Sequence, residues 1–124
     1  MIINLTQHKA TTDQLAAGVK DFSDEDRVYL SEALNFSSVP TMEVIYDRVE
    51  KLNGLAHKEG HFGTQVMIGG ALWLMAPLIR RLMLEGFRPV FAFSVRESVD
   101  EVQADGSVKK VAVFKHAGFV EAIL

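Results

Sequence analysis

Three short segments of the chain carry residue types that can hold a phosphate and move a proton. They are Thr6-Gln7-His8, Gly69-Gly70-Ala71 and Ser94-Val95-Arg96-Glu97-Ser98, and each follows an apolar stretch. Backbone N–H groups at a helix start bind anions, a guanidinium pairs bidentately with phosphate, and histidine exchanges a proton near neutral pH. Because ligands of an open parallel sheet bind beyond the carboxyl ends of its strands, we expect the three segments to share one crevice for a nucleotide or another phosphate-bearing ligand.

Each of these residues also has a purely structural interpretation. His8 is either a ligand contact or a solvated loop histidine. Arg96 is either a phosphate clamp or one half of a surface ion pair with Glu97 or Glu101. The Gly69-Gly70 pair either cradles a phosphate or only allows a tight strand-to-helix connection, and the second role does not exclude the first.

Two further candidates lie outside these segments. Trp73, the single tryptophan of the chain, either stacks on a base or fills the core or a dimer interface. Lys115 and His116, at the end of the last expected hairpin arm, either reach the same crevice or finish an edge strand in polar residues.

The composition limits the class of protein. A chain of 124 residues with 48% hydrophobic and 23% charged residues is typical of a single domain. A net charge of -3 argues against binding duplex nucleic acid, yet a small anionic ligand needs only a few local donors. With no cysteine there is no disulfide, thiolate zinc site or cysteine nucleophile, and no motif predicts a metal site or a cofactor. The longest apolar run, 66–79, is too short to span a membrane, and no signal-peptide pattern is present, so we expect a cytoplasmic protein.

Hydrophobic periodicity and capping signals predict alternating strands and helices. The expected elements are a strand at 2–5, a helix at 13–17, a strand at 19–22, helices at about 24–35 and 41–60, a strand at 64–68, a helix at about 71–85, a strand at 89–95 and a hairpin with arms 99–104 and 107–114. Pro77 must lie in the first turn of its helix or kink it. This order indicates an α/β fold: a small Rossmann-like three-layer domain whose mainly parallel sheet ends in an antiparallel C-terminal hairpin.

Ordered motifs stand at the two ends of the chain. The first is Asn4-Leu5-Thr6-x-His8-x-x-Thr11-x-x-Gln14, and the later ones are Gly69-Gly70, Gly86-x-x-Pro89, Ala92-x-Ser94-x-Arg96, Glu101, Asp105-Gly106-x-Val108-x-Lys110 and Phe114-Lys115-His116-x-x-Phe119. This set resembles the small CRISPR-associated ring nuclease families, which have a CARF-like Rossmann fold. The middle of the chain, from Phe22 to Gly63, has no counterpart in the resemblance. We interpret its helices, at about 23–60, as an elaboration within one domain that spans 1–124.

The resemblance implies a homodimer that binds a cyclic oligoadenylate, a messenger of antiviral defence, in a cleft across the two-fold axis. In some members the ribose 2′-hydroxyl attacks the neighbouring phosphate without a metal and leaves a 2′,3′-cyclic phosphate. By position, Arg96 would stabilise charge on the phosphorane, and His8 and Ser94 would orient the ribose or accept a proton. The other ligand contacts would come from Thr6, Gln7, Gly69, Gly70, Trp73, Glu97, Lys115 and His116.

Two other functions stay open at this point. One is a non-catalytic nucleotide-binding or protein-interaction module of a prophage or plasmid, built on the same fold. The other is a structural protein of a mobile element, in which the glycines serve packing alone.

Overall fold

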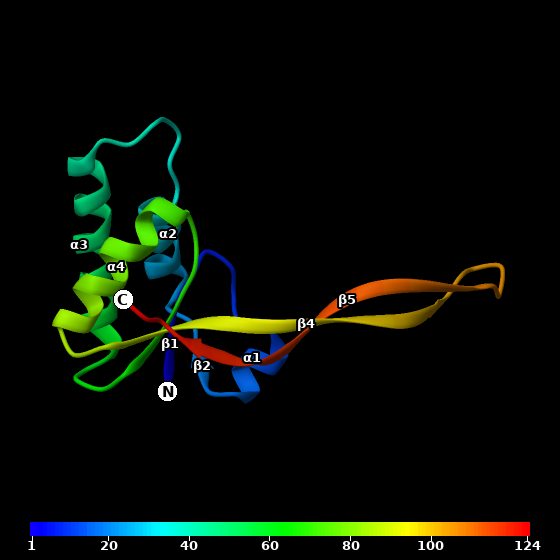
Figure 1. The fold of residues 1–124 in the computed structure, drawn as a ribbon. Helices are drawn as coiled ribbons and strands as arrows, with labels where there is room; N and C mark the ends of the chain where they lie inside the picture. The colour runs from blue at the N-terminus through cyan, green and yellow to red at the C-terminus, as the bar shows by residue number, and fades with distance from the viewer.

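The computed structural model describes residues 1–124 and contains five strands and four helices (Figure 1). In chain order they are β1 (Ile2–Leu5), α1 (Thr12–Ala16), β2 (Val19–Lys20), α2 (Asp24–Leu34), α3 (Met42–Glu59), β3 (Gln65–Ile68), α4 (Leu72–Leu84), β4 (Arg88–Val102) and β5 (Val108–Glu121). None of the helices is long and apolar enough to cross a membrane.

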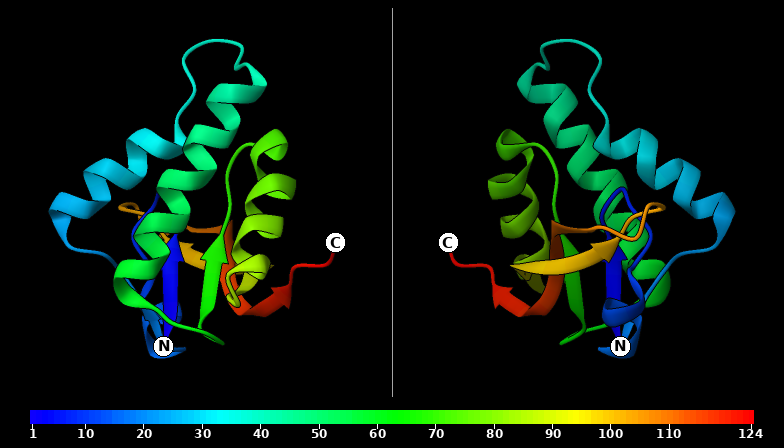
Figure 2. Two further views of the ribbon diagram at one scale, coloured as in Figure 1. Left: turned by 90° about the vertical axis from the view of Figure 1, so that its left-hand side faces the viewer. Right: turned by 90° about the vertical axis from the view of Figure 1, so that its right-hand side faces the viewer.

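One sheet organises the fold, with strand order β2-β1-β3-β4-β5. The first four strands are parallel and β5 is antiparallel to β4. Figure 2 shows β1 and β3 side by side, with α3 and α4 over one face. The α/β fold class is confirmed, as a small Rossmann-like domain with a mainly parallel sheet and an antiparallel C-terminal strand pair.

Alternating side chains divide the core between the two faces of the sheet. Ile3, Leu5, Val66 and Ile68 join the large apolar cluster formed with α2, α3 and α4. A smaller cluster on the opposite face consists of Ile2, Val19, Met67 and Val90, packed against Ala10 and Phe119. Because the central strands are buried on both faces, their sequences read as continuous apolar runs rather than as alternation.

Capping residues define the helix starts as the sequence predicted. Thr11 forms a capping box with Gln14 before α1, and Ser23 and Thr41 each accept a hydrogen bond from the helix they precede. Strand β2 is shorter than the predicted 19–22. Pro77 lies inside α4, five residues after its first residue, so the first of the two predicted alternatives, a first-turn position, does not hold. Its missing N–H leaves the carbonyl of Trp73 without the usual donor.

Strands β4 and β5 continue far beyond the rest of the sheet. Strand β3 pairs with β4 only as far as Val90, whereas β4 and β5 pair from Val90↔Glu121 to Val102↔Val108. Residues 94–116 of this ribbon, which we call the arm, project away from α2, α3 and α4 (Figure 1). The predicted break between the strand at 89–95 and the hairpin arm at 99–104 was therefore wrong, because no glycine, proline or asparagine interrupts the strand between Val90 and Gln103.

The turn at the tip of the arm is the predicted Asp105-Gly106 turn, with Gly106 at a φ of 83°. Asp105 accepts hydrogen bonds from the Ser107 hydroxyl and backbone N–H, at 2.5 and 2.9 Å, and these bonds lower the pKa of Asp105 below 3.8. Because the carboxyl pKa is lower in the folded turn than in the unfolded chain, the ionised Asp105 stabilises the turn at pH values above the unfolded pKa. This stabilisation is lost as the pH falls through the folded pKa.

We predict that Ser107→Ala raises the pKa of Asp105 towards 3.8 without fully restoring it, because the backbone N–H bond remains. An NMR titration of the Asp105 carboxyl carbon measures this shift. An unchanged pKa would show that the hydroxyl bond is not the main cause.

Candidate functional site

A buried asparagine organises the loop after β1. Asn4 is fully buried, and its Nδ2 donates to the carbonyl of His8 at 2.9 Å and to Oδ1 of Asp21 at 2.7 Å. Its Oδ1 accepts hydrogen bonds from the Thr6 backbone N–H at 3.0 Å and the Thr6 hydroxyl at 2.6 Å. All of the polar atoms of this side chain are therefore used, and the loop is held from beneath.

Asp21 and Arg27 complete this support. The Asp21 carboxylate accepts the backbone N–H of Ala10 at 3.1 Å, and the Arg27 guanidinium lies 3.9 Å from it. Arg27 also donates to the carbonyl of Gln7 at 3.4 Å. The side chains of Gln7 and His8 remain exposed. The loop therefore presents these two side chains to solvent on a backbone held at four groups, the N–H of Thr6 and Ala10 and the carbonyls of Gln7 and His8.

The Gly69-Gly70 turn lies next to this loop. A Cβ placed on Gly69 would lie 3.6 Å from Cγ2 of Thr6, so the ends of β1 and β3 are in contact range. Gly70 has a φ of 144°, which disfavours other residues. Strand order reverses between β1, whose other neighbour is β2, and β3, which leads on to β4. Thr6 and Gly69 therefore flank the switch point at which open α/β sheets bind ligands.

Helix α4 begins at this turn without a side-chain cap. Its N-cap is Ala71, and no side chain hydrogen-bonds the N–H groups of the first turn. Thr11, Ser23 and Thr41 cap the other three helices. Among the four helices, α4 alone has first-turn N–H groups without a side-chain cap. These groups lie at the positive end of a helix of 13 residues.

Trp73 stands in the first turn of α4 and is 52% exposed. Its indole packs edge-on against Phe36, with ring centroids 5.6 Å apart, and Arg48 lies over Phe36 at 4.7 Å. Trp73 also lines a cavity of about 580 Å³ with residues 36–40 and Ile45. It is therefore neither a core residue nor free of contacts, and about half of the residue is open to solvent.

The arm carries the remaining predicted residues, on two different faces. In the β4–β5 register Ser94 lies opposite His116, and Arg96 lies opposite Phe114. Residues directly opposite share a face, so Ser94, Arg96 and His116 lie together, on the face that continues from Val90 and the cluster packed against Ala10 and Phe119. Lys115 lies opposite Val95 and Glu97 opposite Val113, so both are on the other face. The prediction that Lys115 and His116 end the last hairpin arm was wrong, because both stand inside β5.

Arg96 is exposed and makes no ion pair within 4 Å, so the alternative pairing with Glu97 or Glu101 is absent. His116 packs on Phe119 at 4.8 Å, and its Nδ1 is buried without a hydrogen-bond partner. These side chains are therefore not occupied by contacts within the arm.

The three predicted segments do not form one crevice of three loops. Thr6 and Gly69 meet at the carboxyl edge of the sheet. The register places Ala92 level with Gly69, so Arg96 is about 13 Å further along the strand. A ligand that touched both groups would have to reach from the α4 amides to the base of the arm.

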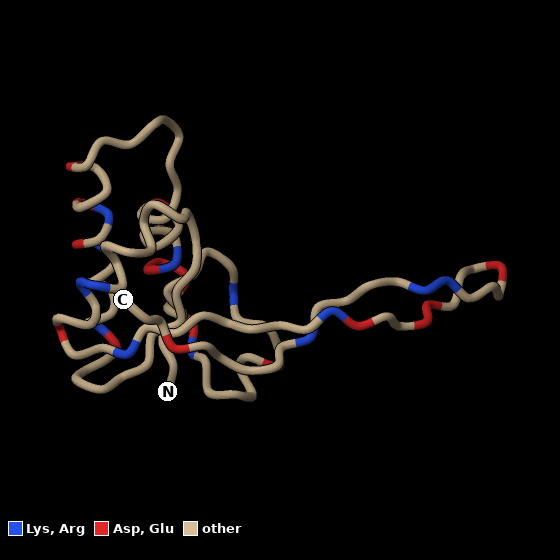
Figure 3. Tube along the Cα trace, viewed as in Figure 1, with Lys and Arg blue, Asp and Glu red and all other residues tan.

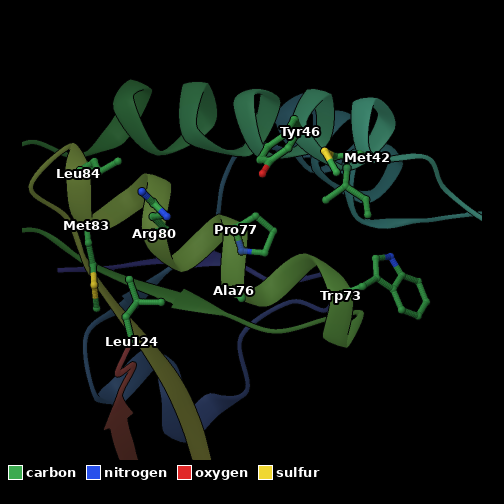
Figure 4. Close-up of a pocket in the computed structure, with 10 residues that line it drawn as sticks. Met42, Tyr46, Trp73, Ala76, Pro77, Arg80, Met83, Leu84 and Leu124 are labelled. Atoms are coloured by element: carbon green, nitrogen blue, oxygen red, sulfur yellow. The ribbon is translucent and has the colours of Figure 1, made fainter.

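A second and larger cavity is lined by neither Thr6 nor Gly69. It has a volume of about 830 Å³, lies between α3 and α4, and includes Tyr46, Pro77, Arg80 and Leu124 (Figure 4). Its lining is mostly apolar, and Trp73 is the only predicted site residue in it.

Sequence reasoning missed the supporting roles of Asn4, Asp21 and Arg27. The available signal was a short polar residue, Asn4, within an otherwise apolar buried strand. Such a residue must have hydrogen-bond partners, but the sequence did not say which.

The comparisons with known proteins identify a family for the chain but no activity. The model of a family described as the uncharacterized protein MJ1673 family matches residues 1–120. The chain belongs to the MJ1673 family. The match covers β1 to β4 and all but the last residue of β5. It therefore includes the loop after β1, the start of α4 and the arm of this MJ1673 family member. Neither the curated proteins nor the solved structures contain a significant match.

Proposed function

We propose that the protein binds a cyclic oligoadenylate at the carboxyl edge of its sheet and cleaves it as a ring nuclease. The observation that carries this proposal is the start of α4, where Ala71 provides no cap, Gly70 leaves the turn open and Thr6 lies beside Gly69. A phosphate there accepts the hydrogen bonds that a capping side chain would otherwise accept. The resemblance of the terminal motifs to ring nucleases favours a cyclic oligoadenylate over other phosphate ligands.

Two features support a ligand larger than a single phosphate group. Trp73 exposes an aromatic surface in the first turn of α4, where an adenine stacks beside a phosphate held by the amides. Arg96 lies about 13 Å along β4 from the level of Gly69. A ring of several nucleotides reaches both positions, and Thr6 lies beside Gly69 at the first of them.

The proposed reaction needs only groups of this chain and the ring itself. The ribose 2′-oxygen attacks the adjacent phosphorus, the bond from phosphorus to the 5′-oxygen of the next nucleotide breaks, and a 2′,3′-cyclic phosphate remains. His8 or His116 takes the proton of the 2′-hydroxyl, and the departing 5′-oxygen gains a proton from water. Arg96 offsets the negative charge of the phosphorane, and Ser94, on the same face, hydrogen-bonds the ribose.

The proposal includes a homodimer in the cytoplasm, with neither duplex nucleic acid nor membrane as a partner. Glu97 and Lys115, on the other face of the arm, contact only parts of the ligand that reach around the ribbon.

Arg96→Ala is expected to lower the single-turnover rate of ring cleavage about 100-fold, with a dissociation constant within a few-fold of the wild-type value. Arg80→Ala removes the same charge from an exposed position on α4 and is expected to leave the rate unchanged. Mass spectrometry of cyclic tri-, tetra- and hexa-adenylate after incubation measures the rate. Equal rates for Arg96→Ala and wild type would remove Arg96 from the mechanism.

One observation favours the second candidate function, a non-catalytic nucleotide-binding or protein-interaction module. The charge proposed for catalysis stands on the arm, away from the amides proposed for binding. Saturable binding of a ring that the wild-type protein never opens would establish this alternative.

A further inference from the structure

The outer half of β4 has an unpaired edge. Strand β4 lies between β3 and β5, but its pairing with β3 ends at Val90. From Ala92 to Val102 it pairs with β5 alone, and all eleven of these residues are exposed. The arm is therefore a two-stranded ribbon with backbone donors and acceptors free along one side of β4. Such ribbons are marginally stable in isolation and are templates for pairing with another strand.

Both outer edges of the arm are free, and the charges indicate which of them favours pairing with its own copy. Strand β4 carries Arg96 together with Glu97, Asp100 and Glu101. The ionisable groups of β5 within the arm are all basic: Lys109, Lys110, Lys115 and His116. Figure 3 shows this distribution, with acidic positions along one strand of the arm and basic ones along the other. Two β5 edges placed together would bring only basic groups into contact, whereas two β4 edges have both signs available.

We propose that two copies of this chain pair antiparallel through the free edges of β4, with a two-fold axis at Ser98. The result is a four-stranded antiparallel sheet in the order β5, β4, then β4 and β5 of the second copy. In this register Arg96 lies opposite Asp100 of the second copy, and the symmetry forms the pair twice. This gives Arg96 the anionic partner that it lacks within its own chain.

Neighbouring registers are less favourable. An axis at Arg96 places the two Arg96 side chains opposite each other, and an axis at Glu97 does the same for Glu97. An axis at Val99 places Glu97 opposite Glu101. Directly opposed like charges destabilise a strand pair, so the axis at Ser98 alone of these four opposes no like charges. It also puts the two wide bodies at opposite ends of the arms, where the slender ribbon of Figure 1 leaves room for them.

This inference specifies the homodimer of the proposed function and uses Arg96, which that function assigns to the phosphorane. Assembly is therefore tested without ligand, and ring binding is measured separately. The test of assembly is the mass of the full-length protein over a concentration series, by light scattering after gel filtration. The wild-type protein is expected to show twice the 13.8 kDa of one chain. Asp100→Lys places a lysine opposite Arg96 and is expected to raise the dimer dissociation constant about 100-fold or more.

A matched control stands next to this position. Glu101→Lys makes the same charge change, and like Asp100 its side chain faces a lysine of β5 within the chain, in the pairs Asp100↔Lys110 and Glu101↔Lys109. Across the proposed interface, however, Glu101 faces the uncharged Val95. Reversal of the Glu101 charge is therefore expected to change the dimer dissociation constant less than about fivefold. The double variant Arg96→Glu with Asp100→Arg is expected to restore the dimer.

Three results would overturn the proposal. They are a wild-type monomer at every concentration, equal effects of Asp100→Lys and Glu101→Lys, and a double variant no tighter than Asp100→Lys. Because these side chains lie on the exposed arm, outside both core clusters, all variants are expected to keep the wild-type circular dichroism of the body.

Discussion

Ala71→Asp is expected to stabilise the protein while it abolishes binding of a cyclic oligoadenylate. Ala71 has the extended backbone of an N-cap, with φ -58° and ψ 134°, but no side chain that can accept a hydrogen bond. An aspartate there caps α4 and adds about 1 kcal/mol of stability. The same carboxylate occupies the proposed phosphate position and repels the ligand, so affinity is expected to fall about 100-fold or more.

Ala71→Asn separates the charge from the cap. Asparagine has the shape of aspartate and caps a helix about as well, but it does not repel a phosphate. Binding to it is expected to fall less than about tenfold, because a neutral side chain is more easily displaced. The single tryptophan, Trp73, provides a fluorescence signal for the titration, and thermal unfolding provides the stability. Equal affinity of the aspartate and asparagine variants would show that no anion binds at α4.

Asn4→Leu is expected to lower the free energy of unfolding by about 3 kcal/mol. Leucine fills a similar volume but leaves the His8 carbonyl, the Thr6 N–H and the Asp21 carboxylate without the partners that Asn4 supplies. The loop after β1 also loses its support, so ring binding is expected to weaken in the same variant. Urea unfolding measures the first effect.

Asn53→Leu is the matched control for this substitution. Asn53 is also buried, at 6% exposure, but its Oδ1 has no hydrogen-bond partner. Leucine there removes an unsatisfied oxygen and is the better helix former. Stability is therefore expected to stay the same or to rise. A similar loss in both variants would mean that burial rather than the Asn4 network sets the cost.

The sequence predicted most of the fold because its local signals agreed with one another. Ser23 and Thr41 mark helix starts, Asp105-Gly106 marks the arm tip, and the apolar runs at 2–5 and 64–68 are the central strands. Fold class follows from the order of such elements.

The site was harder to predict because it depends on where strands end relative to one another. The sequence predicts two separate strands at 89–95 and 99–104, but no residue between them breaks a strand, and pairing with β5 makes them one strand that extends through Val102. The network of Asn4 and Asp21 joins positions 17 residues apart, which no local pattern reveals. The contact of Thr6 with Gly69, by contrast, follows from the rule for parallel sheets and was predictable.

The central claim is that a cyclic oligoadenylate binds at the start of α4. Its most direct test is a titration of ¹⁵N-labelled protein with cyclic tri-, tetra- and hexa-adenylate, followed through the backbone amide resonances. We expect saturable shifts for one ring, largest at Gly70, Ala71 and Leu72 and present at Thr6. Absence of shifts with every ring, or shifts confined to the cavity between α3 and α4, would contradict it.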